Sequence, residues 1–146
     1  MDKSLCQLVD DEPYSLAGFF GEPISKYTRL QAIDDGALVP VSSSIANEAG
    51  FITPVALTSA AWEDCVAWSE EDSRRQTFQE ESGRLWDVLY MASLAARRGG
   101  QEIRYQLYRV PKGGRGVKPR LVALKAICGP DDDGQPCITI MLPEED

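Results

Sequence analysis

The side chains best able to do chemistry in this sequence are carboxylates clustered in its middle third. Residues 70–72 are Glu-Glu-Asp, and residues 80–81 are Glu-Glu. Carboxylates at such spacing can hold a hard divalent cation, which prefers oxygen ligands, or exchange protons with a substrate. Arg74 and Arg75 lie between the two groups. Their presence favours a simpler interpretation, a solvated surface with local ion pairs.

The absence of histidine limits the other catalytic chemistry open to the chain. It excludes Ser-His-Asp and Cys-His sites, histidine acid–base catalysis and the common catalytic zinc sites. The four cysteines, Cys6, Cys65, Cys128 and Cys137, form no C-x-x-C pair, so we expect no structural zinc site. We expect buried, reduced thiols, although Cys128 and Cys137 flank a turn and could form a disulfide across a hairpin. No metal and no other cofactor is expected.

Two loop motifs resemble ligand sites only in composition. Residues 131–134, Asp-Asp-Asp-Gly, lack the spacing and the closing glutamate of a calcium loop, so they predict a hairpin turn. Residues 112–116, Lys-Gly-Gly-Arg-Gly, lack the residue order of a phosphate-binding P-loop. They predict either a flexible basic finger that touches phosphates or a plain hairpin loop.

Length and composition suit one soluble domain. The chain has 146 residues, of which 43 % are hydrophobic and 26 % charged. No apolar run approaches the roughly 20 residues that span a bilayer, and the first residues do not resemble a signal peptide, so we expect a cytoplasmic protein. The net charge of −8 is uneven, because residues 95–125 carry nine basic side chains and one acidic. Such asymmetry indicates a charged partner, or regions that neutralise each other within one fold.

The elements that must position these groups are helices followed by strands. Helical spacing and caps predict helices over residues 29–34, 60–68 and 83–98, and a further helix that ends at residue 49. Residues 69–81 predict either an exposed helix or a long loop. Residues 38–41 predict a short strand. Residues 52–57, which contain Pro54, predict an edge or entry strand at best.

The last third of the chain alternates apolar and polar residues, which is typical of strands. Strands are predicted over residues 103–110, 121–128 and 137–142, forming a three-stranded antiparallel meander. The predicted fold class is therefore α+β, with several helices followed by this meander. Residues 1–26 predict an irregular acidic arm, and residues 27–146 a single α+β domain.

Four stretches together resemble a known family. They are YTRLQAIDDGALV at 27–39, AAWEDCV at 60–66, QEESGRLWDVL at 79–89 and ITIMLPEED at 138–146. The chain resembles small, uncharacterised acidic proteins encoded on bacterial plasmids, integrative elements and phages. The resemblance implies an accessory gene of mobile DNA, a class that often includes inhibitors of restriction or CRISPR systems. It implies no activity and no catalytic residues.

We therefore expect a non-enzymatic interaction protein that inhibits a host defence nuclease complex, of the anti-CRISPR or anti-restriction type. Its acidic surfaces would occupy a basic channel built for the charge of nucleic acid. The residues expected to bind this partner are Glu63, Asp64, Glu70, Glu71, Asp72, Glu80, Glu81, Asp131, Asp132 and Asp133.

Two other function classes stay open. One is an accessory factor that binds nucleic acid through the basic region at 97–125, where tyrosines interleave with cations. Its candidate residues are Arg97, Arg98, Arg104, Arg109, Lys112, Arg115, Lys118 and Arg120. The other is a metal-dependent enzyme that uses carboxylates of residues 70–87.

Overall fold

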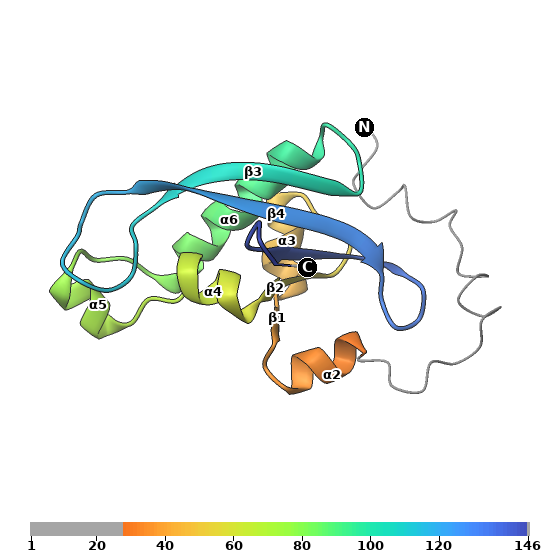
Figure 1. The fold of residues 1–146 in the computed structure, drawn as a ribbon, viewed down its shortest axis with the longest axis horizontal. Coiled ribbons are helices and arrows are strands. Elements are labelled where there is room, and N and C mark those ends of the chain that lie inside the picture. Colours follow the sequence, from red (N-terminus) through yellow and green to blue (C-terminus); the bar gives the residue numbers. More distant parts are fainter. Residues whose placement is uncertain (1–27, 146) are drawn as a thin grey trace.

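The computed structural model of the chain describes residues 28–145 and shows a mixed α+β fold (Figure 1). In chain order its elements are α2 (Arg29–Asp34), β1 (Leu38–Pro40), α3 (Ser43–Ala49), β2 (Val55–Thr58), α4 (Ser59–Cys65), α5 (Glu70–Arg75), α6 (Glu81–Ala96), β3 (Glu102–Arg109), β4 (Arg120–Pro130) and β5 (Pro136–Met141). Within the described residues, no helix is long and apolar enough to cross a membrane. The predicted arm at 1–26 lies outside the described residues.

The strands form one five-stranded sheet in the order β1-β2-β5-β4-β3. The neighbours β3, β4 and β5 are antiparallel, whereas β2 runs parallel to β5 and antiparallel to β1. This corrects the prediction of a three-stranded antiparallel meander. Pro54 misled that prediction, because it lies just before β2 and its carbonyl accepts a hydrogen bond from the Ile138 N–H. A proline at the start of a strand does not confine it to a sheet edge.

Helix α6 supplies the central contact of the core. Its residues Leu85, Val88, Leu89 and Ala92 are buried at the i, i+3, i+4 spacing that puts them on one face. They pack in the same cluster as the odd-numbered side chains of β3, which point to one side of the sheet because side chains alternate along a strand. Figure 1 shows α6 crossing behind β3 and β4. The even-numbered side chains of β3 are exposed on the other side.

The shorter helices begin at the polar caps that their sequences contain. Thr28 and Ser69 form capping boxes for α2 and α5, and the Thr58 hydroxyl accepts the N–H of Ala61 at the start of α4. Helix α3 ends at Gly50, whose φ of 114° is left-handed. The segment at 69–81, predicted as helix or loop, is the short helix α5 followed by a loop.

The register of β4 and β5 keeps two cysteines apart. Cys128 lies opposite Ile138, and Cys137 lies opposite Gly129. Adjacent residues of a strand point to opposite faces, so the side chains of Cys128 and Cys137 lie on opposite faces of the sheet. The hairpin disulfide considered from the sequence is therefore excluded, and both cysteines are buried, as is Cys65.

Candidate functional site

Three of the predicted acidic residues converge on a groove between α5 and the start of α6. The groove encloses about 470 Å³, and its walls include Glu70, Glu80 and Glu81. Phe78 also lines it, with 74 % of its surface exposed. We call this feature the Phe78 groove. A large exposed aromatic ring beside carboxylates is typical of an anchor for another molecule, because apolar area and charge act together there.

Ser73 holds the loop that carries Phe78. Its hydroxyl donates to the Gln79 carbonyl at 3.2 Å, and it accepts the Gln79 N–H at 3.2 Å and the Trp68 indole N–H at 3.1 Å. Ser73 lies on α5, whose first turn is fixed by the Ser69 capping box. Ser73 thus ties the loop after α5 to that helix and to Trp68, which precedes the helix.

A buried arginine side chain lies behind the wall of the Phe78 groove. Arg84 of α6 is only 4 % exposed, and its guanidinium carbon lies 4.5 Å from the centroid of the Trp68 ring. Arg84 Nε donates to the Val66 carbonyl at 3.0 Å, and Nη1 donates to the Val110 carbonyl at 2.9 Å. The Glu81 carboxylate accepts the Trp68 N–H at 3.1 Å. Arg84 therefore joins the end of α4, the helix α6 and the end of β3 behind the groove.

The groove has the chemistry of a binding surface. Glu70 and Glu80 are exposed and make no ion pair among the described residues, so their charges are available to a partner. Arg74, on the same wall, offsets part of this charge. A segment with an apolar side chain and several cations would bury Phe78 and neutralise the carboxylates.

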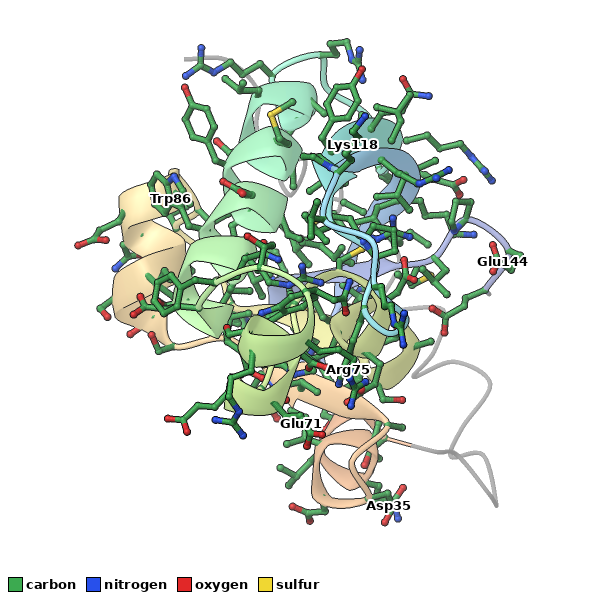
Figure 2. All side chains as sticks on the ribbon, turned by 90° about the vertical axis from the view of Figure 1, so that its left-hand side faces the viewer. Asp35, Glu71, Arg75, Trp86, Lys118 and Glu144 are labelled. Atoms are coloured by element: carbon green, nitrogen blue, oxygen red, sulfur yellow. The ribbon has the colours of Figure 1, made fainter. Side chains whose placement is uncertain are left out.

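Other predicted acidic residues are engaged within the fold. Asp64 forms an ion pair with Arg109 at 3.0 Å, and Glu71 with Arg75 at 3.0 Å on one face of α5 (Figure 2). Glu63 lies 3.6 Å from the ammonium group of Lys112.

Asp72 is buried and accepts the Ser69 N–H at 2.8 Å, which, with the hydrogen bond from the Ser69 hydroxyl, lowers the pKa of its carboxyl group. Asp131 accepts two backbone N–H groups of its own turn, as a hairpin turn requires. Asp132 accepts the first N–H groups of α2, from Arg29 and Leu30. Asp133 is exposed on the same turn, far along the chain from the Phe78 groove.

Some of the basic residues predicted to bind nucleic acid are also engaged within the fold. Arg104 pairs with Glu102, while Arg109 and Lys112 hold the acidic partners just described. Arg97, Arg115, Lys118 and Arg120 are exposed, and none has an ion pair within residues 28–145. Arg98 donates to the Arg104 carbonyl at 3.2 Å.

The loop at residues 112–116, predicted as a flexible basic finger or a plain hairpin loop, is anchored by one glutamine. Gln76, just after α5, donates through Nε2 to the carbonyls of Pro111 and Gly116, at 2.9 and 2.6 Å, and accepts the Gly113 N–H at 2.9 Å. Figure 1 shows this loop beside α5, and Figure 2 shows Lys118 apart from the Glu71–Arg75 pair. Gln76 could not be singled out from the sequence, because no motif marks it. The exposed position of Phe78 was not predicted either, although Phe78 is the single aromatic in the polar stretch 69–81.

The described residues contain no group of three or more carboxylate, cysteine or histidine side chains that could hold a metal ion. Burial, with the neighbouring Asp64 charge, raises the pKa of the Cys65 thiol to about 12. A thiol that stays protonated is a poor nucleophile, so Cys65 serves as a packing residue.

Comparison with known proteins places the chain in one family. A family model described as "Family of unknown function (DUF6573)" matches residues 17–146, so the chain belongs to that family. Neither a curated protein nor a solved structure matches it.

Proposed function

We propose that this member of DUF6573 is a non-enzymatic interaction protein that binds a basic surface of its partner through the Phe78 groove. The observation that carries the proposal is the convergence of Glu70, Glu80 and Glu81 around a phenylalanine that is 74 % exposed. The partner that fits best is a host defence nuclease complex, because such a complex needs a cationic channel for nucleic acid.

The mechanism is competition for that channel. Carboxylates at the groove occupy positions that phosphates take in the nucleic acid, and Phe78 adds apolar contact that a phosphate backbone does not supply. The ordered loop makes the surface rigid before binding, since Ser73 already holds it, and this reduces the entropy lost on association. The remaining acidic residues contribute long-range attraction, because the whole chain has a net charge of −8.

The test uses cells that carry an active restriction or CRISPR nuclease. The efficiency of transformation with a targeted plasmid is measured with and without the protein, and affinity for the purified nuclease complex is measured in parallel. Phe78→Ala and the double variant Glu70→Lys with Glu80→Lys should each weaken binding at least tenfold and abolish protection. Glu71→Lys is the matched control, because it changes the same charge on α5 outside the groove and should retain most of the binding.

Two results would reject the proposal. One is full protection by the Phe78→Ala and the double variants, which would move the contact elsewhere. The other is a wild-type protein that neither protects cells nor binds the nuclease complexes tested.

A second candidate function is nucleic-acid binding through the basic region at 97–125. It is favoured by the anchored loop, which presents Arg115 and Lys118, and by Arg120 at the start of β4. None of the three has an ion pair in the described part of the chain. Binding to single or double strands should weaken steeply with salt, since phosphate contacts release counterions. A gel shift at low salt that detects no complex would reject this candidate.

A further inference from the structure

Within residues 28–145, the outer edge of β3 carries a row of backbone groups that pair with no other strand. The Cys128 N–H donates to the Gln101 carbonyl at 2.8 Å, so odd-numbered residues turn their backbone groups towards β4. The even-numbered residues of β3, from Glu102 to Tyr108, therefore turn theirs away from the sheet. Strand β3 ends the strand order, so no strand of the described fold covers this row. Among described residues, the hydrogen bond from Arg98 to the Arg104 carbonyl is the single one that reaches it.

A groove runs beside this edge. It encloses about 550 Å³ and lies between α6 and β3. Met91, Leu94 and Ala95 form its apolar wall, and Arg98 and Arg104 lie on its basic side. Helix α6 packs on β3, and the lining of the groove also includes Tyr105 and Gln106 of β3 and Ala123 of β4.

We propose that β3 accepts an extended peptide segment of a partner protein as a sixth strand. The unpaired N–H and C=O groups supply main-chain hydrogen bonds to the added strand. Side chains on one side of the segment enter the groove against Met91 and Leu94, which selects apolar residues at alternate positions. Acidic residues of the segment, next to these apolar positions, face the guanidinium groups of Arg98 and Arg104. The ligand class is therefore an extended segment in which apolar and acidic residues alternate.

Charge and backbone groups favour a peptide segment over two other occupants, a second copy of the chain and nucleic acid. A second copy of the chain would bring its own Arg98, which makes no ion pair within residues 28–145, against the same cation, which is unfavourable. Nucleic acid offers phosphates but no row of amides and carbonyls to match the strand. The proposal is independent of the Phe78 groove, which is built from α5 and the start of α6, so either can fail alone.

The experiment selects random twelve-residue peptides, displayed on phage, against the full-length protein. Enriched peptides should alternate apolar and acidic residues. Hydrogen exchange at the amides of Arg104 and Gln106 should slow at least tenfold when such a synthetic peptide is bound. Gln106→Pro removes one outward N–H without touching a bond to β4, and it should weaken binding at least tenfold. Gln106→Ala is the matched control and should bind like the wild type.

Arg98→Glu supplies a second variant at an exposed position, should the proline disturb folding. Selection on Arg98→Glu should shift the enriched peptides from acidic towards basic residues. The proposal is overturned if no peptide is enriched, if enriched peptides bind Gln106→Pro unchanged, or if the Arg104 and Gln106 amides are already protected without peptide. The last result would show that the chain itself or a second copy covers the edge.

Discussion

Arg84 offers a direct test of how the wall of the Phe78 groove is held. The residue is 96 % buried, and no carboxylate of the described residues forms an ion pair with it. Its charge is balanced by two backbone carbonyls, the Gln79 side-chain oxygen and the Trp68 ring. Burial lowers the pKa of its guanidinium group, although an arginine stays charged at neutral pH. We consider Arg84→Met, which keeps the length and apolar stem of the side chain and removes the donors and the charge.

The magnitude follows from opposing contributions. The carbonyls of Val66 and Val110 each lose a donor, at about 1–3 kcal/mol per buried acceptor. The contact with Trp68 contributes about 2 kcal/mol when water is excluded. Relief from burying a cation offsets several kcal/mol of this loss. We therefore expect Arg84→Met to lower the free energy of unfolding by about 2–4 kcal/mol.

Urea denaturation followed by tryptophan fluorescence measures this change, because Trp68 lies directly against Arg84. Arg97→Met is the matched control. It removes the same group from an exposed position at the end of α6, and its effect should stay within about 0.5 kcal/mol. A loss below about 1 kcal/mol for Arg84→Met, or a gain in stability, would refute the reasoning that the two carbonyls depend on this donor.

Three further predictions concern other elements. Gly50→Ala should lower the free energy of unfolding by at least about 1–2 kcal/mol in the same assay, because φ is +114° and the new Cβ would lie 2.8 Å from Ser93 Oγ. The stability advantage of the wild type over Asp72→Asn should be complete above about pH 4 and shrink below it in acid titrations, because the folded state lowers the Asp72 pKa. Mass spectrometry should find Cys65 unmodified by iodoacetamide at pH 8 until urea unfolds the protein, because the buried thiol has a pKa near 12.

Local patterns predict most elements of the fold. Helix α6 and strand β3 could be recognised because their apolar periods of 3.6 and 2 are long and uninterrupted. Strands β4 and β5 could be recognised as apolar runs on either side of a turn signal. The position of β2 inside the sheet could not be predicted, because its partner β5 lies some 80 residues later in the chain. No local sequence signal indicates a parallel pairing. The presence of Pro54 indicated against a strand inside the sheet, although Pro54 precedes β2 and does not interrupt that strand.

The candidate site was predictable only in part, because the role of a carboxylate depends on what folds beside it. Glu70, Glu80, Asp64 and Asp72 were all predicted to bind a partner, which stays a prediction. Glu70 and Glu80 line the Phe78 groove, whereas Asp64 pairs with Arg109 and Asp72 caps α5. A cap within three residues of Ser69 is readable from sequence, whereas an ion pair between α4 and β3 is not.

The position of β5 has a consequence for synthesis on the ribosome. Strand β5 lies between β2 and β4 in the sheet, yet it follows all the other described strands in the chain. At 5–20 residues per second, roughly 4–16 s pass between the synthesis of β2 and that of β5. During this interval β2 has an uncovered inner edge, and β4 has one from its own synthesis until that of β5. Either edge can pair with other chains. Folding of the nascent chain must therefore await translation of β5, and slow codons just before it would lengthen the period in which aggregation competes.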